Sequence, residues 1–461
     1  MRLIYFALFG TVFSIIFINI NVRAQGSSAL TVFVSSTLKV NANPVWVVAA
    51  DVNGDGKPDL ICANIGVYPS DGTMTIFTNN GTGDFGFEHM IAGIAPEMFA
   101  AADVNGDGKP DLIGVGGPEL LILTNNGSGS FGSNATYFIG NPPTAPDFVT
   151  TADVNGDSNL DLIVAITKGP STPGTLMVLT NNGSGIFGSN ATYTVGEIPV
   201  CVTTADINGD GKPDLICANH YSGTLTMLTN DGSGLFVSNA TLNVGFDVNY
   251  VVAADVNGDG KPDLVCANLG PTLTVWTNNG CGVFGSNATY SVGAVGPRCV
   301  VAADVNGDGK VDLICVSDTS SSPLTVLTNN GTGGFGLYAT LGVGHFPGCV
   351  VAADVSGNGR PSLITANAGF ETSGEEYGSL TILSQVNVAP PLLNIMPTGI
   401  NTLTLSWSSF FPGFALETNT DLTTTNWGPA NYTILTNSGT NESATITSSP
   451  SGKLFFRLNS N

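Results

Sequence analysis

Short hydrophobic runs alternate with polar turns along most of this chain, and Gly and Asn separate the runs. The segment 250–293 shows the pattern once in full. Its runs 250–254, 264–267, 273–277 and 288–292 are rich in Val, Ala, Leu and Thr, so each run predicts a short strand. The Asn-Gly pair at 279–280 predicts a turn before the last run. The segment therefore predicts four antiparallel strands joined by tight connections.

An acidic segment of nine residues lies between the first two predicted strands and occurs seven times, at a spacing of about 50 residues. A fixed period of this length predicts a repeat architecture. The first copy reads Asp51-Val-Asn53-Gly-Asp55-Gly56-Lys-Pro-Asp59, and the others begin at Asp103, Asp153, Asp206, Asp255, Asp304 and Asp354. Side-chain oxygens at positions 1, 3, 5 and 9, with a backbone carbonyl at position 7, can converge on one hard cation. Gly at position 6 permits the positive φ that folds the loop back.

Six copies keep every side-chain ligand, so we expect about six structural Ca²⁺ ions. The predicted ligands are Asp51, Asn53, Asp55, Asp59, Asp103, Asn105, Asp107, Asp111, Asp153, Asn155, Asp157, Asp161, Asp206, Asn208, Asp210, Asp214, Asp255, Asn257, Asp259, Asp263, Asp304, Asn306, Asp308 and Asp312. Ser158 at position 6 predicts a weaker third site. The seventh copy has a single carboxylate, Asp354, and is expected to stay empty. The alternative, that these Asp residues only form turns, would leave three carboxylates repelling one another in each loop.

The ends of the repeat array favour a closed ring. The seventh copy lacks a fourth strand, while the segment 33–40, before the first loop, matches 236–244. An N-terminal strand that completes the last blade would cover both free edges. We therefore expect an all-β fold: a seven-bladed β-propeller of four-stranded blades over residues 27–388. A linear solenoid is the alternative, and it would need capping repeats.

The Asp-x-Asn-x-Asp-Gly-x-x-Asp-Leu loop is followed by a strand and by Asn-x-Gly-x-Gly-x-Phe, as at 279–284 and 329–335. This pattern resembles the FG-GAP/VCBS repeat family, whose blades also form the integrin α-subunit head. The resemblance covers about 360 residues. It implies a calcium-loaded propeller, in a family that serves adhesion, carbohydrate binding and some polysaccharide-degrading enzymes. An EF-hand loop begins in the same way, but it needs a Glu at position 12. That position holds Cys62, Gly114, Val164, Cys217, Cys266 and Cys315.

The repeat stops after residue 388, and residues 389–461 contain five or more short strand-like runs. They predict a small β-sandwich, and the segment resembles a fibronectin-III-like module of secreted proteins. The formal net charge of the whole chain is -22, and its 13 Lys and Arg residues form no basic run. Nucleic-acid binding is therefore not expected.

Residues 1–24 are typical of a signal peptide: Arg2 precedes an apolar run over 3–18, and Val22-Arg23-Ala24 fits a cleavage site. An uncleaved membrane anchor is the alternative. No later segment approaches the ~20 apolar residues of a membrane span. We expect a protein that is secreted or held at the cell surface, with no membrane span after signal cleavage.

The eight Cys residues leave two interpretations open in an exported chain. Cys201 with Cys217, and Cys299 with Cys315, would lie on two strands flanking one loop and could form disulfides. Alternatively, these are small buried apolar positions, because Cys62, Cys266 and Cys349 occupy the same places without a partner in their own copy.

The sequence predicts no catalytic residues, because His89, His220 and His345 occur at non-equivalent places and the acidic residues lie mostly in the loops. Two neighbouring positions before each loop vary from copy to copy and are candidates for ligand contact. They hold Val45, Glu97, Asp147, Val200, Asn249, Arg298 and Gly348, and Trp46, Met98, Phe148, Cys201, Tyr250, Cys299 and Cys349. We expect a non-catalytic binding or adhesion module for an extracellular protein or glycan. A polysaccharide lyase or hydrolase, or a structural surface component, is the alternative.

Overall fold

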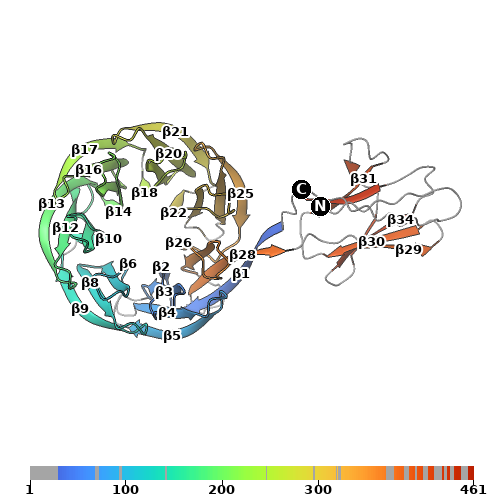
Figure 1. Ribbon diagram of the computed structural model, residues 1–461, viewed down its shortest axis with the longest axis horizontal. Helices are drawn as coiled ribbons and strands as arrows, with labels where there is room; N and C mark the ends of the chain where they lie inside the picture. Colours follow the sequence, from blue (N-terminus) through green and yellow to red (C-terminus); the bar gives the residue numbers. More distant parts are fainter. Residues whose placement is uncertain are drawn as a thin grey trace. The chain divides into compact units, whose positions relative to one another are not determined.

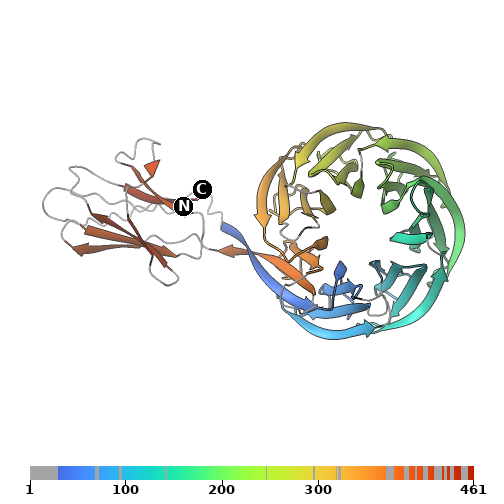
Figure 2. The same ribbon diagram turned by 180° about the vertical axis from the view of Figure 1, so that it is seen from behind.

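The computed structural model describes residues 30–388 except 68–71, 93–95, 141–142, 246, 294–295, 318, 320–322 and 370–377. It also describes the backbone of the strands between residues 394 and 460. Seven four-stranded sheets of the first part form a closed ring (Figure 1; Figure 2). All regular elements in the described residues are strands. The predicted all-β, seven-bladed propeller is confirmed.

The first strand of each blade lies nearest the centre of the ring (Figure 1). The innermost strands are β2 (Pro44–Ala50), β6 (Met98–Ala102), β10 (Ala145–Ala152), β14 (Pro199–Ala205), β18 (Val248–Ala254), β22 (Pro297–Ala303) and β26 (Pro347–Ala353). The second strands are β3 (Asp59–Asn64), β7 (Asp111–Gly116), β11 (Asp161–Thr167), β15 (Asp214–Asn219), β19 (Asp263–Asn268), β23 (Asp312–Ser317) and β27 (Ser362–Asn367).

The other two strands of each blade lie further out. The third strands are β4 (Thr73–Asn79), β8 (Glu119–Asn125), β12 (Pro173–Asn181), β16 (Thr224–Asn230), β20 (Thr272–Asn278), β24 (Leu324–Asn329) and β28 (Gly378–Val388). The outermost strands are β5 (Phe85–Ala92), β9 (Phe131–Phe138), β13 (Phe187–Glu197), β17 (Phe236–Asn243), β21 (Phe284–Ser291), β25 (Phe335–Leu341) and β1 (Leu30–Val40).

The ring closes through the strand that comes first in the chain. The seventh blade has the order β1-β28-β27-β26, so the N-terminal strand pairs with the last strand of the propeller. Val40, at the end of β1, is 5% exposed and belongs to a core cluster that includes Val47 of the first blade and Val350 of the seventh. Because a paired edge offers no free N–H or C=O groups, this closure removes the two edges that an open array would expose.

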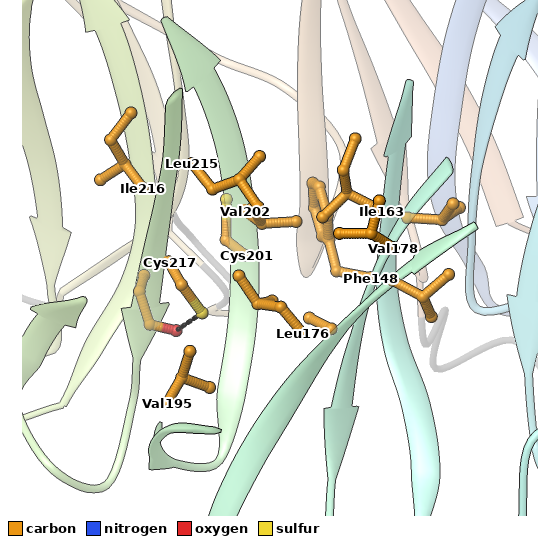
Figure 3. Close-up of a cluster of buried hydrophobic side chains, with 14 of the residues drawn as sticks. Phe148, Ile163, Leu176, Val178, Val195, Cys201, Val202, Leu215, Ile216 and Cys217 are labelled. Carbon is orange, nitrogen blue, oxygen red and sulfur yellow. Dashed lines mark hydrogen bonds between the residues drawn. The ribbon is translucent and has the colours of Figure 1, made fainter. Parts of the chain in front are cut away.

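Apolar side chains fill the space between neighbouring blades. All six residues of β3, β15 and β19 are buried, because each second strand has packed neighbours on both faces. Figure 3 shows one such contact, where Ile163 and Val178 of the third blade face Val202 and Leu215 of the fourth. The outermost strands are mostly exposed, and partly buried positions alternate with exposed ones only in the second half of each strand. This burial places the hydrophobic core in a ring between blades.

One predicted strand differs from the structure in its start. We expected the outer strand of the fifth blade over 288–292, but β21 begins at Phe284, directly after the turn. Its pairing with β20 shifts register between Val275 and Trp276, so Asn287 is an extra residue in a β-bulge. A bulge interrupts the period-2 pattern of a strand. The sequence pattern therefore hid the first half of this strand.

Seven further strands follow the propeller: β29 (Asn394–Gly399), β30 (Thr402–Ser408), β31 (Phe414–Asn419), β32 (Gly428–Pro429), β33 (Thr433–Thr436), β34 (Asn441–Thr447) and β35 (Phe455–Ser460). They form a sheet of order β29-β30-β34-β33 and a sheet of order β32-β31-β35. The side chains of these strands are outside the described residues, so the β-sandwich and the fibronectin-III resemblance stay predictions. The predicted signal peptide at 1–24 also lies outside the described residues. In the described part of the chain, no helix has the length and apolar character of a membrane span.

The closure predicts that Val40→Asp will lower the free energy of unfolding by about 3 kcal/mol, because it buries an unpaired charge between the first and last blades. Val34→Asp on the same strand is the matched control, since Val34 is 51% exposed and its replacement should cost less than about 0.5 kcal/mol. Urea unfolding of both variants measures the difference. Equal losses would mean that the end of β1 does not hold the ring.

Candidate functional site

The acidic loops connect the first and second strands of each blade. Their side-chain oxygens accept hydrogen bonds from backbone N–H groups of the same loop. In the first loop, Asp51 Oδ1 accepts hydrogen bonds from Gly54 N at 2.8 Å and Asp55 N at 3.1 Å, and Oδ2 accepts one from Gly56 N at 2.7 Å. Asn53 Oδ1 accepts from Asp55 N at 3.0 Å. Gly56 has a φ of 81°, in the left-handed region that favours glycine. These hydrogen bonds and the left-handed Gly56 fold the loop back on itself, as the sequence predicts.

A lysine at position 7 covers five of these loops. Lys57 Nζ lies 3.4 Å from Asp55 Oδ2, and the equivalent pairs in loops two, four, five and six are 3.6–3.8 Å apart. The stem of Lys57 fills the space beside Gly81, where an added Cβ would stand 2.8 Å from Lys57 Cδ. These ion pairs are about 40% exposed, so they add little stability. The contact explains why the turn after the third strand carries Gly next to this lysine.

The ninth loop residue has a different environment from the others. Asp59 is fully buried at the start of β3. Its Oδ2 accepts a hydrogen bond from Val52 N at 3.0 Å, and its Oδ1 accepts one from Asn79 N at 2.8 Å. Burial raises the pKa of this carboxyl, the two N–H groups oppose the rise, and the charges of Asp55 and Asp51 add to it. Asp59 thus ties the loop to the end of the third strand.

Asn79 extends this connection to the neighbouring blade. Its Nδ2 donates to Pro58 O at 3.0 Å and to Val355 O of the seventh blade at 2.8 Å. In blades two to six, the equivalent side chains each donate to the second loop residue of the preceding blade at 2.7–2.9 Å; they are Asn125, Asn181, Asn230, Asn278 and Asn329. We call each buried Asp with its Asn partner an Asp–Asn node. Six of the seven neighbouring blade pairs are joined in this way.

Sequence reasoning missed the Asn residues of the nodes. We read the Asn-Asn-Gly segments as turns, and the second Asn does belong to the turn. The first Asn ends the third strand and is only 3–5% exposed. The signal was the presence of Thr-Asn before the turn in six copies, which a turn alone does not require.

The seventh blade changes both members of the node. Ser362 replaces the buried Asp, and Gln385 stands where the other copies have Asn. Ser362 Oγ lies 3.0 Å from Ser384 Oγ, and Gln385 Nε2 donates to Pro361 O at 3.2 Å. The longer Gln keeps the contact that Asn79 makes with Pro58, although the carboxylate is gone. This blade also has the loop that we expect to bind no calcium.

The structure places the predicted metal ligands in two groups. Residues at positions 1, 3 and 5 lie on the partly exposed loop, and residues at position 9 lie buried at the first residue of the second strand. Their donors are all oxygen atoms, which suits a hard cation. Within the described residues, however, no three or more His, Cys, Asp or Glu side chains converge into a metal site by themselves. A Ca²⁺ ion here would therefore also need the Asn amide, a backbone carbonyl and water, a mixture that calcium sites use.

The third loop keeps its shape at a conformational cost. Ser158 at position 6 has a φ of 71°, and its N–H still donates to Asp153 Oδ2 at 2.8 Å. A non-glycine residue in the left-handed region costs about 1–2 kcal/mol. The third loop keeps the hydrogen bonds that the other loops make. Ser158 in place of Gly therefore strains the backbone of the loop but does not change its fold.

A cavity of about 790 Å³ opens at the other end of the inner strands. It is lined by residues at the start of these strands and by residues at or just after the end of the second strands, such as Thr167, which ends β11, and His220, which follows β15. All seven residues at the first variable position line it: Val45, Glu97, Asp147, Val200, Asn249, Arg298 and Gly348. The variable positions of the repeat therefore meet in one place, away from the acidic loops.

β-Bulges present these variable residues to the cavity. In six blades the pairing of the first and second strands skips one residue, for example Asp147 between Pro146 and Phe148. A bulged residue has no partner in the ladder, so its side chain can be aimed independently of the strand. The residue at this position can therefore differ from blade to blade while the hydrogen bonds between the two strands stay the same.

Aromatic rings form the base of the cavity. The ring centroid of Trp46 lies 5.9 Å from that of Phe148 and 6.3 Å from that of Tyr250, and the Phe148 and Tyr250 centroids lie 6.0 Å apart. These residues come from the first, third and fifth blades, so their rings meet at the centre of the propeller. Cys201, Cys299 and Cys349 hold the equivalent position in three other blades and are 1% exposed.

Several polar atoms around this cavity are buried without a hydrogen-bond partner in the described residues. They are Trp46 Nε1, Asp147 Oδ2, Thr167 Oγ1 and His220 Nδ1. Burial raises the pKa of Asp147 to about 6, and the negative charge of Glu97 adds to this rise. The nearby Thr167 hydroxyl opposes the rise, although the two side chains do not form a hydrogen bond of good geometry. His220 Nε2 lies 3.8 Å from Asp247 Oδ1. Sequence reasoning did not single out Thr167 and His220 as cavity residues, because their place at the cavity depends on how the ring brings the ends of separate second strands together.

The buried cysteines follow the second interpretation, and Cys281 is exposed. All eight are free thiols, and seven are buried. Cys201 pairs in register with Ala218 rather than Cys217, and Cys299 pairs with Val316 rather than Cys315, so neither proposed disulfide spans a directly opposed pair. Figure 3 shows Cys201 and Cys217 among aliphatic side chains. They serve as small core residues here.

The fold and the repeats define a seven-bladed β-propeller with one repeated loop between the first and second strands of each blade. The chain belongs to the FG-GAP-like repeat family, whose pattern matches residues 51–114, 103–164, 153–217, 206–266, 255–315 and 304–365. No curated protein sequence was found to match the chain.

Solved structures share the fold at low sequence identity. BBS1N, crystallised in complex with ARL6DN, has a TM-score of 0.55 and 11% identity, and the match covers 78% of this chain and 99% of that one. An Agrocybe aegerita lectin, described as recognising non-reducing terminal N-acetylglucosamine, has a TM-score of 0.46 and 23% identity, over 67% of this chain and 81% of the lectin. These likenesses concern the fold of the propeller.

The Asp–Asn node predicts that Asn230→Ala will lower the free energy of unfolding by about 2–3 kcal/mol, because the carbonyls of Val154 and Pro213 lose their buried donor. Asn243→Ala is the matched control: Asn243 is exposed at the end of β17, and its loss should cost less than about 0.5 kcal/mol. Urea unfolding compares the two. A loss at Asn230 no larger than at Asn243 would show that the node does not hold the blades.

The raised pKa of Asp147 predicts a pH-dependent stability difference between the protein and Asp147→Asn. The stabilising contribution of this carboxyl is complete below its unfolded pKa of 3.8 and is lost as pH rises through about 6. The wild type should therefore lose about 1–2 kcal/mol relative to Asp147→Asn between pH 4 and pH 7, after allowance for partial exposure. Unfolding of both proteins across this range measures it, and a constant difference would contradict the assignment.

Proposed function

We propose that this chain is an exported, calcium-stabilised propeller that acts as a non-catalytic binding module for an extracellular protein or glycan. The observation that carries the proposal is the separation of repeated and varied residues. The loops, nodes and core are nearly the same in each blade, whereas the residues around the central cavity differ from blade to blade. A scaffold whose blades share the same residues at one end and carry different residues at the other is suited to recognising one ligand.

The calcium part of the proposal rests on the chemistry of the loops. Each of the six complete loops carries three Asp and one Asn in a shape already fixed by backbone N–H groups. Asp51 and Asp55 are close enough to Asp59 to raise its pKa, and a divalent cation would relieve that repulsion. When bound, the ion supplies positive charge and a link between loop oxygens. Asp51, Asn53 and Asp55 would hold it from the exposed side.

Export follows from the N-terminal pattern and fits the calcium level outside cells. Extracellular modules bind calcium with a Kd of about 10⁻⁴–10⁻³ M. At about 1 mM calcium and a Kd of about 0.1 mM, each site would stabilise the fold by about 1.4 kcal/mol. Six independent sites would then contribute about 8 kcal/mol, which is comparable to the stability of a typical domain.

The proposal predicts about six bound ions per chain in equilibrium dialysis at 1 mM calcium, and a large fall of the melting temperature when a chelator is added. Asp55→Asn should remove one ion, because it takes a carboxylate from a complete loop. Asp354→Asn in the seventh loop is the matched control and should leave the number of ions unchanged. A melting temperature that does not respond to the chelator would contradict the structural role of calcium.

A further inference from the structure

We propose that the central cavity binds the end of a neutral or amino-bearing glycan chain and discriminates against acidic sugars. This inference rests on the proposed binding function and adds the place and the ligand class. It is carried by three features of the cavity: its unpartnered polar atoms, its aromatic base and its two carboxylates.

The unpartnered atoms require a ligand that both donates and accepts hydrogen bonds. Trp46 Nε1 can only donate, an ionised Asp147 can only accept, and the Thr167 hydroxyl can do either. Buried polar groups without partners are costly, so a ligand that pairs them gains affinity. Sugar hydroxyls are donors and acceptors at once. A ring that carries several of them can satisfy atoms on different blades.

The base of the cavity suits the apolar face of a sugar ring. Trp46, Phe148 and Tyr250 meet there, and Met98 lies beside them in the lining. Aromatic side chains offer a flat apolar surface with polar tips, which suits ligands with one apolar face. A volume of about 790 Å³ lies within the range of about 300–1,000 Å³ of small-ligand pockets. It leaves room for more than one sugar residue.

The charges of the cavity decide the kind of sugar. Glu97 and Asp147 stand on the adjacent second and third blades, close enough for Glu97 to raise the pKa of Asp147. Arg298, from the sixth blade, is the one Lys or Arg side chain among the lining residues, and it has interactions of its own. Two carboxylates against one guanidinium disfavour a further carboxylate or sulfate. A uronic acid is thus excluded, whereas a neutral hydroxyl or an ammonium group is accepted.

Matched sugars that differ only in charge test the inference directly. Ligand-observed NMR on the full chain compares D-glucose with D-glucuronate and D-galactose with D-galacturonate, with D-mannose and D-glucosamine added. We expect at least one neutral or amino sugar to bind, with a Kd on the order of millimolar, and the acid partner of a bound sugar to bind at least tenfold more weakly. Binding should also weaken below about pH 6, as Asp147 becomes protonated.

Two variants locate the binding to the cavity. Asp147→Asn should weaken binding of the neutral sugar about tenfold and reduce the difference in affinity between that sugar and its acid partner. Trp46→Phe removes the Nε1 donor but keeps an aromatic ring. Glu88→Gln is the matched control: Glu88 is exposed on the outer strand β5, and its replacement should change neither affinity.

The outcomes separate this inference from the broader function. Equal or preferred binding of the acid sugars would overturn it and would indicate that Arg298 dominates the cavity. Failure of every neutral and amino sugar to bind would also overturn it. Sugar binding that both cavity variants leave unchanged would place the ligand elsewhere on the propeller, which refutes the inference while the proposed binding function stands. A chain that binds neither sugars nor extracellular proteins would refute both.

Discussion

The propeller depends on one buried carboxylate in each of six blades. Asp59 and its equivalents are fully buried, yet each accepts two backbone N–H groups, one from its own loop and one from the end of the third strand. The Asn at that strand end then donates to a carbonyl of the preceding blade. A buried carboxylate without such donors would cost several kcal/mol. The carboxylate is therefore satisfied only when the loop and the end of the third strand are in place, and the Asn at that strand end adds the contact to the preceding blade.

This arrangement separates the two ends of the propeller. At one end, the acidic loops and the nodes use nearly the same residues in each blade, because they carry the contacts between blades. At the other end, bulged residues such as Asp147 and Arg298 take no part in the pairing of strands, so they can differ without loss of the fold. Calcium chemistry and ligand recognition can thus be divided between the two ends, as the proposed function requires.

The sequence was sufficient to predict the closed ring and its acidic loops. The period of the repeat, the pattern of strands and the matching segments at the two ends of the array all indicate one closed ring. It did not reveal what joins the blades. Asn79 reads as part of a turn, and its partner at Val355 lies 276 residues away in the chain. The start of β21 was hidden by the bulge at Asn287, and the roles of Thr167 and His220 in the cavity depend on how the ring brings separate connections together. Local patterns thus predicted the elements, and long-range contacts determined the site.

Hydrogen exchange at the nodes tests this account most directly. The amide N–H of Asn79 and its equivalents donates to a fully buried carboxylate of its own blade, and the Asn side chain donates to the preceding blade, so we expect this amide to exchange only when the node opens. We predict that these amides exchange as slowly as those of the buried second strands, and far more slowly than the exposed amide of Thr82, a few residues on in the turn. Node amides that exchange as fast as the turn would contradict the claim that the buried Asp–Asn pairs hold the propeller together.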